Sequence, residues 1–230
     1  MSDITAHTDP RRTEHPLRQI RASFTEDAAT EDTATEGAAT GDGTVTVYQA
    51  YQPAIALPAI ERGRFAPEYN RGRMTWIKPS FLWMMYRSSW ANNPGQEYVL
   101  AIELTRSGFH AALSQAVASS YQSRLHASKD AWRTGLRRSS VRYQWDPERD
   151  LHLRPLPWRS LQIGLSGSAV HDYVDHWITG ITDVTPLAHR IRRLLQEQDV
   201  SGAAALLPDE RPYPLPEDVA RRIDADRPKR

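Results

Sequence analysis

The residues best suited to chemistry lie between Arg71 and Trp90, where aromatic and basic side chains are concentrated. Lys78 stands just before Pro79 and Ser80, and serine is a residue type that caps the first turn of a helix. The free N–H groups of a first helical turn bind anions, and a neighbouring lysine adds positive charge. We therefore predict that Lys78 and Ser80 help to bind a phosphate-bearing cofactor.

The helix that follows, predicted over Phe81 to Trp90, is apolar on nearly every side and belongs in the centre of a fold. Arg87 on this helix is therefore predicted to be buried and to need a carboxylate or phosphate partner. We take Arg87 as a candidate catalytic residue and Tyr86 as a candidate cofactor contact. Core packing explains the apolar side chains of this helix, and a structural ion pair is the alternative for Lys78 and Arg87.

An alternating pattern predicts a strand over Thr44 to Tyr51. Because alternate residues of a strand face opposite sides, Tyr48 faces one side, whereas Gln49 and Tyr51 face the other. A tyrosine ring beside an amide can stack on a base or nicotinamide ring and hydrogen-bond to its edge. Tyr48 is thus a candidate catalytic residue, and Gln49, Tyr51 and the earlier Arg21 are candidate cofactor ligands. Plain strand packing is the alternative explanation.

Two carboxylates stand where another strand, predicted over residues 141–145, should end at Asp146 and Pro147. A carboxylate at a strand end can act as a general base or stabilise a cationic transition state. It can equally pair with an arginine as part of the structure. We take Glu148 as the catalytic candidate and Gln162, in the next predicted strand, as a further cofactor-binding residue.

Several other kinds of site are excluded. The chain contains no cysteine, so it has no disulfides, thiolate metal ligands or thiol nucleophiles. Asp172 and His176 have a metal-compatible i,i+4 spacing, but no third ligand lies nearby in the sequence, so no metal site is predicted. A Walker-type phosphate loop and a dinucleotide G-x-G-x-x-G fingerprint are also absent from the sequence. Any nucleotide site must therefore be of another kind.

These candidates need a fold to position them, and the sequence predicts a single α+β domain over residues 17–207. The pattern indicates about six strands in a mixed or antiparallel sheet and four to five helices. Residues 1–16 are predicted to be disordered, the acidic repeat at residues 25–43 to be a flexible surface loop, and residues 208–230 to be a Pro-rich charged tail. No apolar run is long enough to span a membrane, so a cytoplasmic location is expected.

Charge is unevenly spread along the chain, although the formal net charge is only +1. Residues 61–90 contain six basic and two acidic residues, and residues 121–160 contain nine basic and four acidic residues. If the two regions meet in the fold, they form a basic face suited to a nucleotide, RNA or DNA. Scattered, solvated arginines are the alternative.

Five stretches carry a resemblance to a known family: residues 20–24, 45–51, 73–88, 144–149 and 159–165. The third of these, from Arg73 to Ser88, is long and highly specific. Together they resemble the family named domain of unknown function 4291, over roughly residues 17–200. The acidic repeat is the main departure from the family pattern, and the resemblance implies no activity.

The candidate residues are also similar in arrangement to those of ADP-ribosyltransferases, which use short motifs on a compact mixed fold. By this analogy the protein is a nucleotide-dependent transferase that uses NAD and modifies a nucleic acid or another nucleophilic acceptor. Arg21 would hold a phosphate, Tyr48 or Tyr51 would stack on nicotinamide, and Glu148 would stabilise the oxocarbenium-like centre.

The alternative hypothesis is a non-catalytic RNA- or DNA-binding module with a basic, aromatic face. Aromatic residues interleave with the basic segments and would supply stacking and phosphate contacts; they are Trp76, Trp132, Tyr143 and Trp158. Replacing Glu148 with glutamine separates the two hypotheses, because binding should survive and catalysis should not.

Overall fold

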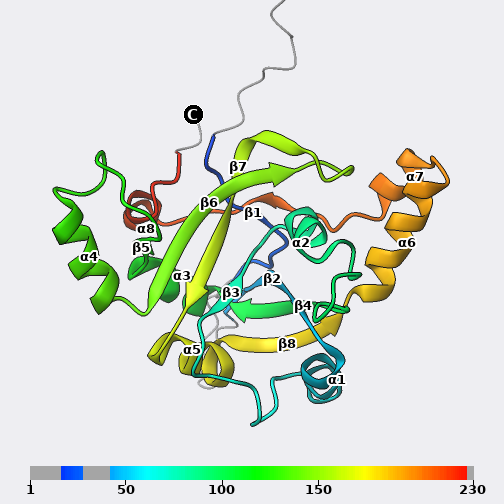
Figure 1. Cartoon of the computed structure of the whole chain (residues 1–230), viewed down its shortest axis with the longest axis horizontal. Helices are drawn as coiled ribbons and strands as arrows, with labels where there is room; N and C mark the ends of the chain where they lie inside the picture. The colour runs from blue at the N-terminus through cyan, green and yellow to red at the C-terminus, as the bar shows by residue number, and fades with distance from the viewer. Residues whose placement is uncertain (1–16, 28–41, 227–230) are drawn as a thin grey trace, which may run out of the picture.

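The computed structural model describes residues 17–27 and 42–226. Residues 1–16, 28–41 and 227–230 lie outside this description, and with them the expected disordered N-terminus and most of the acidic repeat. The described residues form an α+β fold with three sheets (Figure 1). In chain order the elements are β1 (Arg21–Ala22), β2 (Thr44–Tyr51), α1 (Pro53–Arg62), β3 (Thr75–Ile77), α2 (Phe81–Ser88), β4 (Tyr98–Thr105), α3 (Arg106–Ser114), β5 (Val117–Ala118), α4 (Lys129–Arg138), β6 (Val141–Arg149), β7 (Pro155–Leu165), α5 (Ser168–Asp172), the π-helical turn η1 (Tyr173–Trp177), β8 (Ile178–Asp183), α6 (Thr185–Gln196), α7 (Val200–Ala205), β9 (Arg211–Pro212) and α8 (Glu217–Arg222).

The first large sheet has the strand order β2-β4-β8 and is antiparallel throughout. Its strands bury both faces, because Val45 and Val47 belong to one apolar cluster while Tyr48 belongs to a second. This division confirms the alternation predicted for β2. The second cluster is covered by α2 and α6, which contribute Met85 and Ile191 among others.

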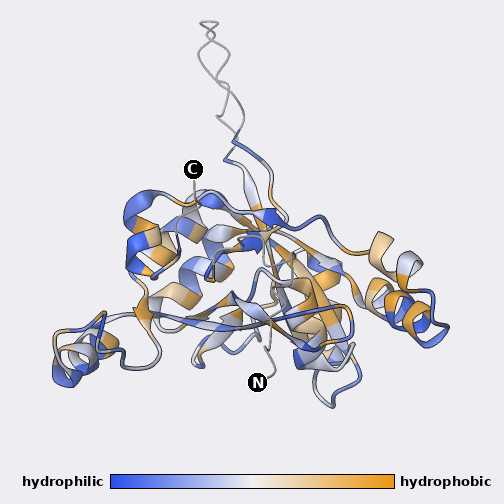
Figure 2. Ribbon diagram, turned by 90° about the horizontal axis from the view of Figure 1, so that it is seen from above, coloured by the Kyte–Doolittle hydropathy of each residue, from blue (hydrophilic) through white to orange (hydrophobic). Residues whose placement is uncertain are grey.

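The second large sheet has the order β3-β7-β6-β5, with only the β5–β6 pair parallel. Its long β6–β7 hairpin crosses the molecule diagonally, with α4 at one side and α6 and α7 at the opposite side (Figure 1). Apolar side chains of β6 and β7 share the first cluster with those of β2 and β4, so the two sheets bury a common core. Figure 2 shows hydrophobic and hydrophilic residues alternating along the outer helices, as expected for helices that pack on one side only.

β6 extends further than the sequence predicted, since it continues through Asp146 and Pro147 to Arg149. The ladder tolerates a proline there for two reasons. The register between β6 and β7 shifts between Pro147 and Arg149, and β5 pairs only with Arg142 and Tyr143, so nothing in β5 needs the missing N–H. Asp146 and Glu148 consequently lie within a strand and not beyond its end.

The C-terminal segment is part of the core, whereas a surface tail was predicted from residue 208 onward. β9 pairs with β1, and α8 packs against α3. Tyr213, Val219 and Ile223 are all buried in the first apolar cluster. The high proline and charge content of this segment concealed these three well-spaced apolar residues.

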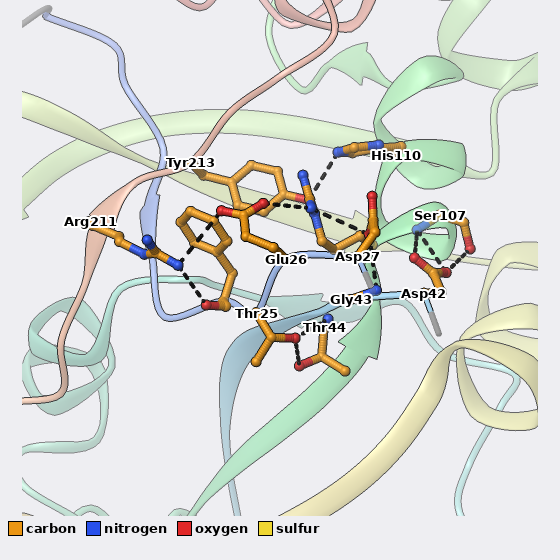
Figure 3. Close-up of polar contacts among 12 residues, drawn as sticks. Thr25, Glu26, Asp27, Asp42, Gly43, Thr44, Ser107, His110, Arg211 and Tyr213 are labelled. Atoms are coloured by element: carbon orange, nitrogen blue, oxygen red, sulfur yellow. Dashed lines mark hydrogen bonds and ion pairs between the residues drawn. The ribbon is translucent and has the colours of Figure 1, made fainter. Parts of the chain in front are cut away.

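The two described segments on either side of residues 28–41 are joined directly to each other. The Thr25 N–H donates to the Thr44 carbonyl at 2.9 Å, and the Gly43 N–H donates to the Asp27 carboxylate at 2.9 Å. Arg106 pairs with Glu26 at 3.0 Å and reaches Asp27 as well (Figure 3). Residues 25–27 and 43–44 therefore lie side by side.

Among the described residues, no helix is both long enough and apolar enough to cross a membrane.

Candidate functional site

A cleft of about 440 Å³ opens between β2, β3, α2 and β7. Three of its lining residues are charged, and all three are cationic; they are Arg73, Lys78 and Arg87. Its walls also carry several aromatic rings and amides. The full lining consists of Gln49, Ala50, Tyr51, Ile55, Tyr69, Asn70, Arg73, Met74, Thr75, Trp76, Lys78, Trp83, Met84, Arg87, Gln96 and Gln162.

One wall of the cleft is a closed hydrogen-bond network centred on Gln49, which is only 3% exposed. The Gln49 amide donates to Thr75 Oγ1 at 2.7 Å and to the Trp76 carbonyl at 2.9 Å, and it accepts from the Tyr173 hydroxyl at 2.7 Å. Tyr51 joins the same network through the Tyr69 hydroxyl at 2.9 Å. Both Gln49 donors are therefore used within the protein, which makes this residue a structural part of the wall.

Burial raises the pKa of the Tyr51 and Tyr173 hydroxyls well above the usual value for tyrosine. Desolvation is the largest cause for both side chains, since an ionised phenol would lose its hydration inside the fold. These hydroxyls therefore remain protonated donors at neutral pH and do not act as bases.

Lys78 lies at the bottom of the cleft with its side chain 1% exposed. It directly follows β3, and its carbonyl accepts from the Tyr48 N–H at 2.8 Å, which fixes its position beside β2. The Lys78 ammonium is 3.0 Å from Asp146 Oδ2 and 3.4 Å from the centroid of the Trp83 ring. Burial lowers the pKa of Lys78 to about 7, and the Asp146 carboxylate opposes this shift.

The N-terminus of α2 binds carboxylates of the chain itself. Ser80 caps the helix by accepting from the Trp83 N–H at 3.1 Å, and its hydroxyl donates to Glu148 Oε1 at 2.8 Å. The Phe81 N–H donates to Glu210 Oε1 at 2.6 Å. Burial is the main cause that raises the pKa of Glu210, and the nearby Glu148 charge adds to it. The capping role of Ser80 is confirmed, but its anion partners come from within the fold.

Three further candidates lie outside the cleft lining. Tyr48 is 2% exposed and packs edge-on against the Phe81 ring at 5.5 Å, so it belongs to the core. Arg21 donates to the Glu210 carbonyl at 2.6 Å. Tyr86 is 45% exposed and has the Arg149 guanidinium 3.6 Å above its ring.

Arg87 differs from its prediction, because it is exposed and not buried. The helix α2 has one solvent-facing side, which carries Tyr86 and Arg87, although its sequence is apolar nearly all round. The Arg87 side chain donates to Gln96 Oε1 at 3.3 Å and has no need of a buried carboxylate partner. It lines the mouth of the cleft, where an incoming ligand could reach it.

The structure thus brings together only half of the predicted site residues. Gln49, Tyr51, Lys78, Arg87 and Gln162 line one cleft, whereas Tyr48, Ser80, Glu148, Arg21 and Tyr86 do not. Sequence reasoning missed Arg73, Trp76 and Trp83 as lining residues. Strand alternation could have indicated Trp76, because it lies two residues before Lys78 and so faces the same side.

The two basic segments do meet in the fold, but not as a uniform basic face. Lys78 pairs with Asp146, so the contact between the segments joins opposite charges. The aromatic residues assigned to that face are partly used inside the fold as well. Trp132 donates to the Ala118 carbonyl at 2.8 Å, and Tyr143 is 2% exposed.

Comparison with known proteins gives one assignment. No curated protein matches this chain. The family model described as domain of unknown function (DUF4291) matches residues 37–213, which span every strand of the two large sheets and the whole cleft lining. The match covers well over half of the chain and includes four of the five stretches that carry the resemblance, all except residues 20–24. The protein therefore belongs to the DUF4291 family.

Proposed function

We propose that the cleft binds a nucleotide-type ligand and that the protein is a nucleotide-dependent transferase, with NAD as the first donor to test. The observation that carries the proposal is the charge of the lining: all its charged residues are cationic, beside aromatic rings. Its volume of about 440 Å³ lies within the range of roughly 300–1,000 Å³ that is typical of small-molecule sites. A phosphate-bearing ligand with a flat ring matches both features.

Arg73 and Arg87 are the proposed phosphate ligands. Both are exposed on the cleft lining, so their guanidinium groups can turn toward an incoming anion and bind two phosphate oxygens at once. The rings of Trp76 and Trp83 are the proposed stacking surfaces for a base or a nicotinamide ring. Gln162, the cross-strand partner of Gln144, supplies an amide for the edge of the ring.

The carboxylate closest to this cleft is not Glu148. Glu148 Oε1 accepts from Ser80 and from the Arg149 N–H, both at 2.8 Å, which holds that oxygen at the start of α2. Asp146 instead contacts the cleft through Lys78. In our proposal the acidic group that supports transfer is therefore Asp146, and a Glu148→Gln change should alter stability more than ligand affinity.

Calorimetric titration of the full chain with NAD, ADP-ribose and AMP tests this proposal. We expect binding that weakens about tenfold or more in Arg87→Gln and in Arg73→Gln, because each loses a charged hydrogen bond to phosphate. The matched control is Arg190→Gln, which removes an exposed arginine from α6, away from the cleft lining. The proposal fails if none of these ligands binds, or if the control weakens binding as much as the two cleft variants.

A second hollow favours RNA or DNA as a partner of the same protein. It has a volume of about 300 Å³ and is lined by Arg18, Arg124 and Arg159 together with serine and glutamine side chains. Asp224 pairs with both Arg18 and Arg124, whereas Arg159 donates to the Trp145 carbonyl at 3.1 Å. Arg159 is thus the arginine best placed to contact a phosphodiester.

The salt dependence of binding to single-stranded RNA or DNA tests this second function. We expect the slope of log affinity against log salt to decrease by about 1 in Arg159→Gln, with no change in Arg190→Gln. A flat salt response in the unmodified protein would count against any nucleic-acid role.

A further inference from the structure

The chain uses arginine for nearly all its positive charge, which makes a buried lysine conspicuous. Of its 29 lysine and arginine residues only three are lysines, namely Lys78, Lys129 and Lys229. Lys78 has its side chain 1% exposed, whereas Lys129 is exposed on α4. An arginine keeps its charge at any pH that proteins tolerate, but a lysine amine can lose its proton when buried. Of lysine and arginine, the buried position therefore holds the one that can become neutral.

Several groups around Lys78 set the balance between its charged ammonium form and its neutral amine form. Asp146 Oδ2 at 3.0 Å and the face of the Trp83 ring at 3.4 Å stabilise the ammonium. Asp146 is itself fixed, since its other oxygen accepts from the Gln144 amide at 2.6 Å. From β6, Glu148 and Arg149 act on the amine with opposite sign, and from β2 the Tyr48 N–H donates to the Lys78 carbonyl and fixes its main chain.

The cleft side of Lys78 carries positive charge. Arg73 and Arg87 line the same cleft, and no carboxylate does. An empty cleft therefore disfavours a third positive charge, while an anionic ligand between these groups would favour it. The protonation of Lys78 is thereby coupled to whatever fills the cleft.

We propose that Lys78 is the proton-exchanging residue of this cleft and accepts the proton of a hydroxyl or amine acceptor that attacks the bound nucleotide. The inference rests on the proposed function and names a residue that carries its chemistry. Lys78 is the catalytic residue, and Asp146 is a positioning residue that acts through it.

In this step one bond forms, one bond breaks and one proton moves. A lone pair of the acceptor oxygen or nitrogen forms a bond to the electrophilic carbon or phosphorus of the nucleotide. The bond from that atom to the leaving group breaks, and the leaving group departs with the bonding pair. The acceptor proton passes to Lys78 Nζ, and the resulting ammonium is stabilised by the Asp146 carboxylate. No oxidant or reductant is involved.

The pKa of about 7 that burial gives Lys78 suits this role, because both forms are then populated near neutral pH. Bound phosphate adds negative charge and should raise the Lys78 pKa, so nucleotide binding takes up protons above pH 7. Affinity for the nucleotide should accordingly fall as the pH rises through 7 and above, while the fraction of the complex with a neutral Lys78 amine, the form that accepts the proton, increases.

Because the chain has only three lysines, nuclear magnetic resonance can follow each of them separately. Full-length protein labelled with ¹³C at lysine Cε is titrated with acid and base, and Lys78→Arg and Lys129→Arg assign the signals. We expect the Lys78 signal to titrate with a midpoint near 7, and AMP or NAD to move that midpoint upward. Asp146→Asn, which removes the opposing carboxylate, should move the midpoint of the free protein downward.

The outcomes separate the inference from the proposed function. A Lys78 midpoint above about 9 would overturn the inference, since the amine would then be a permanent cation. A midpoint that stays unchanged while calorimetry shows bound nucleotide would overturn it as well. A midpoint near 7 in a protein that binds no nucleotide counts against the proposed function only. Lys129→Arg serves as the calorimetric control, because Lys129 is exposed on α4 and this variant should bind nucleotide with the same proton uptake as the native protein.

Discussion

Burying the charged Lys78 side chain lowers the free energy of unfolding, because the ammonium loses its hydration. Its pKa falls from the usual 10.5 to about 7 in the folded state, chiefly through burial. Below pH 7 the amine is charged in both the folded and the unfolded chain, so the full cost of burying that charge is present. Between pH 7 and 10.5 the folded chain alone has lost the proton, and the cost diminishes.

Stability should therefore rise with pH more in the native protein than in Lys78→Met. We expect the difference in unfolding free energy between them to change by up to about 1.4 kcal/mol per pH unit above pH 7. Urea unfolding at pH 7 and pH 9 measures this difference. An equal response of both proteins to pH would show that Lys78 remains charged in the fold.

Gly164 shapes the cleft by leaving room for the ring of Trp76, one of the lining residues. A Cβ at this residue would lie 2.9 Å from the Trp76 ring and 3.0 Å from the Met74 sulfur, closer than real contacts allow. Glycine thus lets the Trp76 ring pack closely against β7 as part of the cleft wall.

We expect Gly164→Ala to destabilise the protein by about 1–3 kcal/mol and to weaken ligand binding, because the Trp76 ring must move. Gly135→Ala is the matched control, since its Cβ would meet only Val117 at 3.9 Å and alanine favours the helix α4. Thermal unfolding and calorimetry measure both effects. Equal stability of the two variants would contradict the role given to this glycine.

At the scale of elements, the start of α2 joins three distant parts of the chain. Ser80 caps the helix and also donates to Glu148 of β6, while Glu210, just before β9, accepts from the Phe81 N–H. The positive electrostatic potential at the start of α2 thereby offsets the repulsion between the carboxylates of Glu148 and Glu210.

Ser80→Ala should cost more stability than an ordinary cap. We expect a loss of about 2–3 kcal/mol, because Glu148 loses a donor together with the cap. Ser128→Ala, which removes the cap of α4 at an exposed site, should cost about 1 kcal/mol. Chemical denaturation of both variants gives the comparison, and equal losses would mean that the Glu148 contact contributes nothing.

The sequence predicts a helix or strand well when the residues that determine it lie close together in the chain. β2 follows from alternation, and the start of α2 follows from its serine cap, so both were predicted close to their observed positions. α4 was not predicted as a helix. It has no buried residue, and five of its ten residues are charged, so its few apolar side chains gave too weak a signal for a packed helix.

The site was harder to predict than the strands that build it. Alternation correctly separated Tyr48 from Gln49 and Tyr51, but it could not tell which side would open as a cleft. That outcome depends on how β3 and α2 pack on β2 and β7, which is a long-range property of the fold. For the same reason Glu148 was indistinguishable from Asp146 until Ser80 was seen to bind it.

At the scale of the whole molecule, the N- and C-terminal parts of the chain close the fold together. β1 pairs with β9, and Arg18 pairs with Asp226 at 3.0 Å. The Trp145 indole donates to the Ile223 carbonyl at 2.7 Å, which ties α8 to β6. Removing the C-terminal segment would expose the apolar surface that it covers on α3 and β6.

Truncation after Leu207 should therefore abolish cooperative folding, because buried Tyr213, Val219 and Ile223 are lost with it. Truncation after Asp226 is the control and should leave the melting temperature within about 1 °C, since it keeps the Arg18–Asp226 pair and all three buried residues. Calorimetric melting of the two shortened chains tests this. A cooperative transition in the chain truncated after Leu207 would show that the fold does not require residues 208–226.

Because residues 25–27 and 43–44 lie side by side, the fold should tolerate changes in the length of the chain between them. Thr25 and Thr44 are held together by a main-chain hydrogen bond, and Arg106 secures Glu26 beside them (Figure 3). Closing a loop whose ends are already adjacent costs only about 0.6 kcal/mol more for each doubling of its length. Changing the number of residues between these two ends should thus cost the fold little. A reporter domain spliced in at this point would likewise leave β2 in register with β4.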